Sequence, residues 1–387
     1  MISKFLSRNY GKVGSLYTWG NGYHTNLGHD DEMPCLRPKK VETTHRVPSN
    51  MQEGSNYHLR RTTQPLKAKF KIVKTGMLHT AAISETGQLY TFGNESYNKL
   101  GFLDNPMIPG RVLGLIGINV VDVALALDST LALTDNGRVF TWGYGGETNG
   151  NLYAALFKEE AGALGLGDLY NYSVPTAIPN FEDVIQIEAG FYHGLGLTKN
   201  GHVYSWGNNE FGELGVEMEF AKSPVKIDLE GITKISAAAN YSVALNNFGD
   251  VWVWGRNHYG QLGVKEEKLF KPYKLTTGAR DIEAGEGCLM IVKNNELYLA
   301  GLREFYELTH FPTQSVPIKL SCGDDHAEFV AANGLVYAMG GLFSEKPQGY
   351  FFHKRNSNFS EAPAGFFTGK ILHLAGKYNY HAAVLED

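Results

Sequence analysis

A short segment that ends in an aromatic residue and a glycine recurs along this chain, and no other feature constrains the fold as strongly. The clear copies are GSLYTWG (14–20), GQLYTFG (87–93), GRVFTWG (137–143), GHVYSWG (201–207), GDVWVWG (249–255), ELYLAG (296–301) and GLVYAMG (334–340). Alternating apolar residues that run into a glycine are typical of a β-strand followed by a tight turn. The chain is therefore predicted to consist of repeated strand units with a period of about 50 residues.

A second apolar segment precedes most copies at a constant distance. A histidine, or a residue that replaces it, stands eight residues before the glycine in several units, and the aromatic position follows five residues after that glycine. Each unit thus contains two strands joined by a short turn. The residues that we assign to the structural repeat are Trp19, His79, Phe92, Trp142, His193, Trp206, Trp254, His326 and His381.

The repeat predicts how the units assemble. One small sheet cannot bury both of its apolar faces, whereas sheets stacked around an axis cover one another. We therefore predict an all-β fold, a seven-bladed β-propeller that forms a single domain over residues 1–387. The segment GKYNYHAAVLED (376–387) matches GMLHTAAISET (76–86), but no glycine strand follows it. The ring is accordingly predicted to close by pairing the N-terminal strand (residues 14–20) with the C-terminal segment (residues 371–387).

The motif GxxxH followed by GxVYxWGxNxxGxLG, as found in residues 190–215 and 249–263, resembles the repeat of the family named after the regulator of chromosome condensation. The resemblance covers the whole chain and weakens in the last two units. It implies a seven-bladed propeller. It implies less about activity, because this propeller serves in a Ran exchange factor, in ubiquitin ligases and ciliary proteins, in a plant ultraviolet-B photoreceptor and in mitochondrial proteins tied to ribosome or respiratory assembly. The five tryptophans do not supply the cluster that the photoreceptor would require.

Composition narrows the location and the partners. The net charge of −5 argues against a surface that binds nucleic acid or anionic lipid over its whole extent. Cys35, Cys288 and Cys322 form an odd set without a CxxC spacing, so neither a disulfide framework nor a zinc site is indicated. No apolar run is long enough to span a bilayer. The basic, hydroxylated start MISKFLSR makes residues 1–13 a short targeting segment and favours a mitochondrial location, with a cytoplasmic or nuclear location as the alternative.

The repeat histidines are the obvious candidates for a metal or acid–base site. His79, His193, His326 and His381 occur once per unit at the same repeat position, so a ring is expected to hold them apart. We expect them to form hydrogen bonds to the backbone within or between blades. The glycine-rich stretches 143–150 and 162–167 are interpreted as turns and not as phosphate loops, because no βαβ pattern surrounds them. No catalytic residue, cofactor site or metal site is predicted.

Three predicted insertions, residues 29–70, 144–163 and 341–370, interrupt the repeat. From residue 37 to residue 74 the chain has ten Lys or Arg against two Glu, which is typical of a solvated loop; the alternative is contact with RNA, an acidic protein surface or anionic headgroups. The second insertion contains a predicted amphipathic helix (151–165). The third is rich in Phe, which either contacts a partner or packs back onto the ring. The candidate partner-binding residues are Arg37, Lys39, Lys40, Arg46, Arg60, Arg61, Phe351, Phe352 and Phe359.

The sequence predicts a non-catalytic interaction scaffold, an accessory subunit of a larger respiratory or ribosomal assembly in mitochondria. The alternative is a guanine-nucleotide exchange factor for a small GTPase, which would insert a loop against the nucleotide site. The acidic net charge and the lack of a basic nuclear-type cluster weaken the nuclear version of this alternative. No loop matches a catalytic motif, so the sequence does not predict an enzyme.

Overall fold

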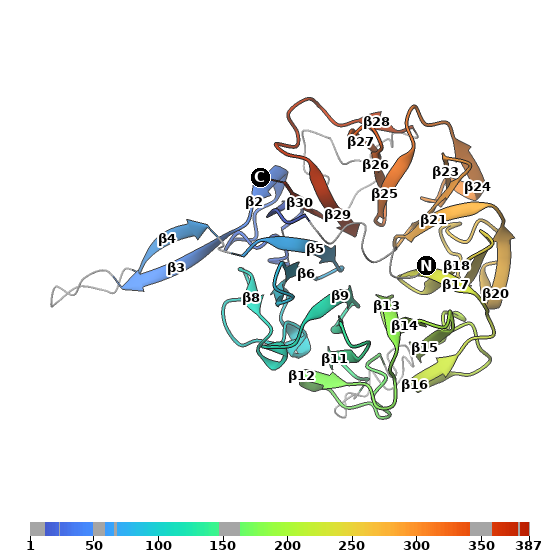
Figure 1. The fold of residues 1–387 in the computed structure, drawn as a ribbon, viewed down its shortest axis with the longest axis horizontal. Coiled ribbons are helices and arrows are strands. Elements are labelled where there is room, and N and C mark those ends of the chain that lie inside the picture. The colour runs from blue at the N-terminus through green and yellow to red at the C-terminus, as the bar shows by residue number, and fades with distance from the viewer. Residues whose placement is uncertain are drawn as a thin grey trace.

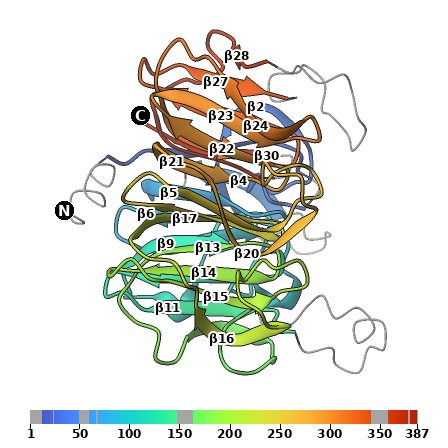
Figure 2. The same ribbon diagram turned by 90° about the vertical axis from the view of Figure 1, so that its right-hand side faces the viewer.

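The computed structural model describes residues 12–22, 24–48, 59–65, 68–146, 163–340, 358–377 and 380–386. Seven four-stranded antiparallel sheets are arranged around a central axis (Figure 1), which confirms the all-β, seven-bladed propeller. Seen from the side, the strands of successive blades are stacked one above another (Figure 2). In the described part of the chain, no helix has the length and apolar character needed to cross a membrane.

We number the blades in chain order from the first that is continuous in sequence. Blade 1 contains β5 (Phe70–Thr75), β6 (His79–Ser84), β7 (Leu89–Gly93) and β8 (Gly110–Arg111). Blade 2 contains β9 (Val120–Leu125), β10 (Ser129–Thr134), β11 (Val139–Gly143) and β12 (Tyr172–Ala177). Blade 3 contains β13 (Val184–Ala189), β14 (His193–Thr198), β15 (Val203–Asn208) and β16 (Phe220–Lys226). Blade 4 contains β17 (Ile232–Ala238), β18 (Tyr241–Asn246), β19 (Val251–Arg256) and β20 (Lys268–Thr276). Blade 5 contains β21 (Ala279–Ala284), β22 (Cys288–Lys293), β23 (Glu296–Gly301) and β24 (Phe305–Phe311). Blade 6 contains β25 (Pro317–Cys322), β26 (Ala327–Ala331), β27 (Val336–Met339) and β28 (Ser360–Glu361). Two short 3-10 helices, η1 (Ser96–Asn98) and η2 (Leu113–Leu115), lie in blade 1.

The seventh sheet, which we call the closing blade, combines the two ends of the chain. Its strand order is β2 (Cys35–Lys40), β1 (Ser15–Gly20), β30 (Tyr380–Leu385) and β29 (Ile371–Lys377). β1 and β30 pair without interruption from Ser15↔Leu385 to Gly20↔Tyr380. The predicted closure of the ring by the N-terminal strand and the C-terminal segment is therefore confirmed.

The recurring letters of the repeat each meet one local requirement, as blade 3 illustrates. Gly207 has φ +102, and a side chain there would place its Cβ 2.2 Å from the carbonyl oxygen of Tyr192, which only glycine avoids. Ser205 donates its hydroxyl to the carbonyl of Leu214 at 2.8 Å, which fixes the turn that follows. The indole of Trp206 donates to the carbonyl of Ala163, next to the corresponding turn of blade 2, at 3.1 Å. The motif therefore holds each blade together and fastens it to the preceding blade.

The apolar cores lie between neighbouring blades and not within them. One cluster joins Leu131 and Leu133 of blade 2 to Ile187 and Trp206 of blade 3, and similar clusters recur at the other described interfaces. Every blade thus depends on its neighbours for the burial of its apolar faces.

Two of the predicted insertions are narrower than expected. β2 and β28 are ordinary outer strands of their blades, although they fall within residues 29–70 and 341–370. Outer strands lack the aromatic–glycine motif and expose one face, which explains why the sequence pattern missed them. Among the described residues, a two-stranded hairpin of β3 (Glu42–Pro48) and β4 (Leu59–Pro65) forms a sheet that is additional to the blades. Residues 151–162 of the predicted helix, Phe351, Phe352 and most of the predicted targeting segment lie outside the described residues.

Candidate functional site

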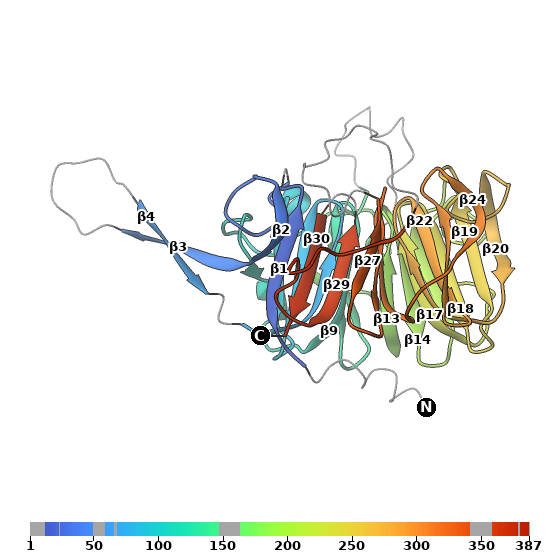
Figure 3. The same cartoon turned by 90° about the horizontal axis from the view of Figure 1, so that it is seen from above.

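The hairpin of β3 and β4, which we call the arm, leaves the ring between two buried anchors. Val41 and Phe70 are each 1% exposed and pack in the core next to β1. The amide of Val41 donates to the carbonyl of Leu16 at 2.9 Å, and Phe70 exchanges two backbone hydrogen bonds with Gly14. Figure 3 shows the arm extending from the rim of the ring, away from the blades. The root of the arm is therefore fixed where the closing blade meets blade 1.

The register of the arm brings together three of the predicted partner-binding residues. Arg46 is paired with Arg61, and Val47 with Arg60, within a ladder that runs from Glu42↔Pro65 to Pro48↔Leu59. These arginines thus occupy two adjacent pairs of the hairpin.

Three further predicted residues lie on β2, the outer strand of the closing blade. Arg37, Lys39 and Lys40 are all exposed, and β2 pairs with β1 along one edge only. Pro38 removes a donor from this strand, as is common on the edge of a sheet. Only Val41 separates β2 from β3, so the basic residues of β2 lie next to the arm along the chain. We call this set the basic rim: Arg37, Lys39, Lys40, Arg46, Arg60 and Arg61.

The remaining basic residues of the first predicted insertion do not all belong to this surface. Lys69 lies directly before β5, the innermost strand of blade 1, and Lys71 lies within it. Both side chains are half-buried. Lys74 reaches Glu188 of blade 3, with Nζ 3.4 Å from Oε1. Burial alone would lower the pKa of Lys74, but Glu188 and other acidic groups raise it above its ordinary value. Part of the local basic excess is thus directed toward the axis of the ring.

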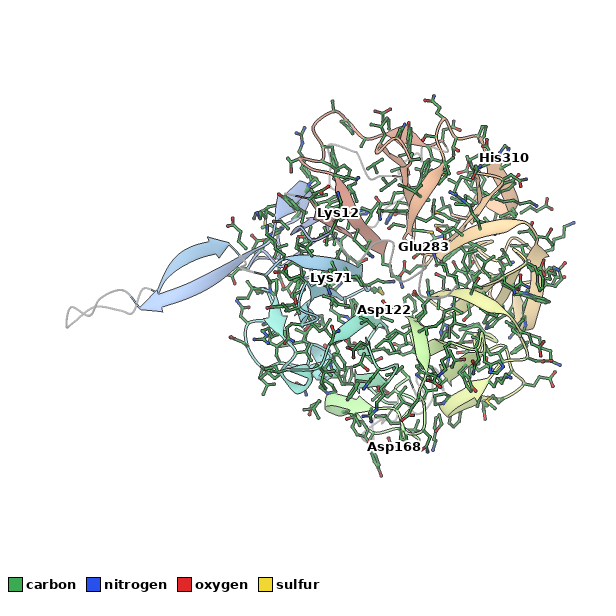
Figure 4. The ribbon with its side chains drawn as sticks, in the orientation of Figure 1. Lys12, Lys71, Asp122, Asp168, Glu283 and His310 are labelled. Atoms are coloured by element: carbon green, nitrogen blue, oxygen red, sulfur yellow. The ribbon has the colours of Figure 1, made fainter. Side chains whose placement is uncertain are left out.

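Acidic and basic side chains from several inner strands gather around this axis. Asp122 and Glu283 project from the inner strands toward the centre (Figure 4). Burial raises the pKa of Asp122 to about 6, against the opposing effect of Lys74. In blade 4, Lys234 Nζ lies 2.6 Å from Asp281 Oδ1 and 3.6 Å from Glu283 Oε2, both of blade 5. These contacts join different blades, and the sequence signal for them was a charged residue in otherwise apolar inner strands.

Two of the repeat histidines form hydrogen bonds between blades. His79 Nε2 lies 2.8 Å from Thr130 Oγ1, and His193 Nε2 lies 2.9 Å from Ser242 Oγ. The partners are side-chain hydroxyls of the next blade, whereas we expected backbone groups. Burial, with a smaller contribution from Lys377, lowers the pKa of His193 to about 3. His193 is therefore neutral near pH 7, which suits a structural hydrogen bond.

The other two repeat histidines contradict the expectation that the ring holds them apart. The ring centroids of His326 and His381 are 4.4 Å apart, because blade 6 and the closing blade are neighbours. Glu328 lies beside them and is fully buried, with Oε1 3.2 Å from His381 Nδ1. Burial opposes the ionisation of Glu328, but His381 and His326 hold its pKa below the ordinary value. Within the described chain, these three residues form a group whose ligand atoms are all within 4.8 Å of one another.

Sequence reasoning missed Glu328, although a signal was present. The residue two positions after the repeat histidine is apolar in the other units, as in Ala81, Leu195 and Ala383, and is acidic only in DDHAEF (324–329). An acid at a buried strand position needs a partner to offset its desolvation. The pattern thus pointed to a polar cluster in this blade.

The described phenylalanines of the third predicted insertion pack against the ring. Phe359 contacts Phe311 and Phe329 edge-on, with centroid distances of 5.6 and 5.2 Å. Phe366 packs edge-on against Trp19 at 6.3 Å. For these residues the structure favours the alternative of packing onto the propeller.

Comparison with known proteins supports the propeller fold described above. The family model for the RCC1-like domain matches residues 10–317. The human E3 ubiquitin-protein ligase HERC2 is 33% identical over 209 residues, which cover 52% of this chain and 4% of that protein. The protein RUG3 of Arabidopsis thaliana, described as mitochondrial and as containing an RCC1 domain, is 32% identical over 227 residues, or 56% of this chain and 43% of that protein. The chain thus matches less than half of the length of each of these relatives.

Solved structures show the same fold. Yeast RCC1 (Prp20), solved in complex with Kap60, superposes with a TM-score of 0.80 at 19% identity, covering 100% of this chain and 92% of that one. Human WBSCR16 superposes with a TM-score of 0.75 at 18% identity, covering 97% and 100% of the two chains. Together with the repeat motif and the seven closed blades, the match over residues 10–317 places this chain in the family of RCC1-like domains.

Proposed function

We propose that this protein is a non-catalytic interaction scaffold, an accessory subunit of a larger mitochondrial assembly, and that its basic rim binds an acidic surface of a partner protein. The observation that carries the proposal is the arm. β3 and β4 pair with each other, and the arm extends away from the blades (Figure 1). A two-stranded hairpin is at best marginally stable in water without a third element to pack on. A partner that covers the arm would supply that element.

Charge favours an acidic partner. The exposed residues Arg37, Lys39 and Lys40 continue into the arm with Arg46 and its cross-strand partner Arg61. The chain as a whole carries a net charge of −5, so this basic segment opposes the overall sign. Localised opposite charge steers association and fixes orientation more than it adds affinity. Binding is therefore expected to weaken as salt increases.

The mitochondrial location rests on two supports. The N-terminal segment MISKFLSR is basic and hydroxylated, and one relative, RUG3, is described as mitochondrial. Fluorescent tagging at the C-terminus, with and without residues 1–13, tests this part of the proposal. Cytosolic signal from the full-length chain would contradict it.

The arm can be removed at a defined place. Glu42 and Pro65 are a cross-strand pair at its root, so replacing residues 43–64 with Asn-Gly, which favours a two-residue hairpin turn, keeps both anchors in place. We expect this variant to melt at the temperature of the full chain and to lose the proteins that co-purify stoichiometrically from mitochondria. A variant that keeps the same partners in the same amounts would overturn the role of the arm.

A second variant separates charge from shape. Changing Arg46, Arg60 and Arg61 to Gln keeps the hairpin and removes its positive charge, and we expect weaker binding of the partner. The matched control changes three lysines of another outer strand, β20, to Gln: Lys268, Lys271 and Lys274. Equal losses in both variants would show that binding follows total charge and not the basic rim.

Exchange activity on a small GTPase is the alternative function. Prp20p, one of the solved structures with this fold, is described by its binding properties to Gsp1p and histones, and the family resemblance extends that alternative to this chain. Release of labelled GDP from a panel of small GTPases tests it directly. Acceleration by the purified protein at catalytic amounts would overturn the non-catalytic proposal.

A further inference from the structure

Three side chains with metal-binding atoms meet at the interface between blade 6 and the closing blade. His326 lies immediately before β26, Glu328 lies in β26, and His381 lies in β30. All three are buried, with exposures between 0% and 5%. They come from two sheets, so the group exists only when the ring is closed.

Gly376 of β29 marks the point on which the three side chains converge. A Cβ built on Gly376 would lie 2.6 Å from His381 Nδ1, 2.7 Å from Glu328 Oε1 and 3.0 Å from His326 Nε2. The lack of a side chain at residue 376 therefore leaves the three polar atoms uncovered on the side of β29. The three ligand atoms lie within 4.8 Å of one another, so shifts of about 1 Å would let one zinc ion, with bonds of about 2.0–2.2 Å, reach all three. The 3.2 Å between His381 Nδ1 and Glu328 Oε1 is close to the ~3.4 Å between two ligands of a tetrahedral zinc ion.

The hydrogen bonding of His326 also departs from the repeat. In His79 and His193 the Nε2 atom contacts a hydroxyl of the next blade. In blade 4 this hydroxyl belongs to Ser242, the residue after Tyr241. At the same position of the closing blade, the residue after His381 is Ala382, which has no hydroxyl to offer His326. Within the described part of the chain, His326 Nε2 is buried without a hydrogen-bond partner. Its other ring nitrogen, Nδ1, lies 3.6 Å from Asp325 Oδ1, which resembles the carboxylate–histidine arrangement that orients zinc ligands.

We propose that His326, Glu328 and His381 form a Zn²⁺ site that links blade 6 to the closing blade. Two imidazoles and one carboxylate are a ligand set that zinc accepts, and they leave the fourth tetrahedral position for a water molecule. Mg²⁺ and Ca²⁺ prefer shells of six or more oxygen atoms, which this group does not offer. The competing interpretation is a metal-free hydrogen bond between His381 and Glu328.

The location gives the site a role in ring closure. His381 pairs with Trp19 of β1 and with Gly376 of β29, while His326 and Glu328 belong to blade 6. An ion bound to all three would hold the strand pair formed by the two chain ends against the rest of the ring. Because the ligands are assembled only in the folded ring, zinc would stabilise the folded state by mass action.

Co²⁺ is the probe for the test, since tetrahedral Co²⁺ absorbs visible light. The full-length protein is stripped with a chelator and titrated with Co²⁺, and Zn²⁺ is then added as competitor. We expect one equivalent of Co²⁺ with a tetrahedral spectrum, its displacement by Zn²⁺, and a melting temperature that rises by a few degrees in Zn²⁺. Glu328→Gln preserves the shape of the side chain, and it should lower Co²⁺ affinity at least tenfold.

Gly376→Ala is the sharper variant, because it keeps all three ligands and places a methyl group against their binding atoms, which must then move apart. The backbone of Gly376 is not in the left-handed region, so its conformation permits alanine. It should also lower Co²⁺ affinity at least tenfold. His193→Gln is the matched control, since His193 occupies the same repeat position in blade 3 without a neighbouring carboxylate, and it should still bind one equivalent.

Two results would overturn the proposal. Wild-type protein that shows neither a Co²⁺ spectrum nor a Zn²⁺-dependent rise in melting temperature contains the hydrogen-bonded cluster only. Folded Glu328→Gln and Gly376→Ala proteins that bind Co²⁺ as tightly as the wild type would place the ion elsewhere. Circular dichroism establishes folding of each variant, and the wild-type titration decides the matter even if one of them fails to fold.

Discussion

The turn that joins the second and third strands has the same length in most blades, and this regularity yields a quantitative prediction about closure. In blade 3 the turn is GLTKNGHVYSWG (196–207), in which the amide of Gly201 donates to the carbonyl of Thr198 and Gly201 has φ +76. In the closing blade the equivalent strands, β30 and β1, are not consecutive. Joining Asp387 directly to Gly14 gives AVLEDGSLYTWG, which aligns with the blade 3 turn without a gap. The observed pairs match too, since Ala383↔Tyr17 corresponds to Gly196↔Tyr204.

Backbone cyclisation at this junction should stabilise the protein strongly. Only residues 1–13 are removed, and among the described residues this breaks the exposed ion pair between Lys12 and Glu386, which contributes little to stability. Linking the ends of a chain of about 374 residues removes conformational entropy from the unfolded state. The chain-entropy relation gives ~6 kcal/mol at 25 °C, an upper value because unfolded chains retain some structure.

Urea denaturation followed by circular dichroism measures the gain. The cyclic protein is compared with the linear chain of the same residues, and with a second cyclic protein in which a flexible linker of about ten residues joins the ends. Both cyclic forms should be more stable than the linear chain, and the direct junction should be at least as stable as the long linker. A direct junction that is less stable than the long linker would refute the inferred register, because it would strain the pairing of β30 with β1.

Three further predictions test individual side chains. The pKa of His193 is about 3 in the folded chain and about 6.5 when unfolded, so its contribution to stability is complete above pH 6.5 and is lost as pH falls toward 3, by at most about 1.4 kcal/mol per pH unit. His193→Gln should therefore flatten the plot of unfolding free energy against pH in this range, measured by urea titrations, and an unchanged slope would contradict the assignment. Reversing the charges of Arg37, Lys39 and Lys40 to Glu should weaken partner binding in pull-down titrations, and wild-type affinity that does not change between low and high salt would exclude the basic rim as an electrostatic surface. Trp19→Ala should cost about 3–5 kcal/mol of unfolding free energy, because its indole is 1% exposed in the core between blade 6 and the closing blade; a loss below about 1 kcal/mol in urea melts would show that this strand does not hold the ring closed.

Much of the fold could be predicted because the repeat letters answer local steric and hydrogen-bonding needs. The glycine at position 207 avoids a backbone clash, and the serine and tryptophan before it bond to fixed carbonyls. Such requirements appear in the sequence wherever the blade is regular. The outer strands β2 and β28 meet no such requirement, since they pair along one edge only, and their positions were therefore missed.

The candidate sites were predicted less completely because they depend on contacts between blades. The spacing of His326 and His381 along the chain does not reveal that their rings lie 4.4 Å apart. The sequence indicated a polar cluster in this blade only through the acidic residue at position 328, where the other units have an apolar residue. The basic count from residue 37 to residue 74 predicted Arg37 to Lys40 as a surface, but it could not tell that Lys74 faces the axis.

The pairing of β1 with β30 also has a consequence for biosynthesis. β1 leaves the ribosome about 360 residues before its partner β30, and synthesis of the intervening chain takes roughly 20–70 s at about 5–20 residues per second. During that time Leu16 and Trp19, both buried in the finished ring, lack the cover of β30. An unpaired strand edge of this kind is a template for pairing with other chains. The nascent protein is therefore expected to need a chaperone until β30 is made.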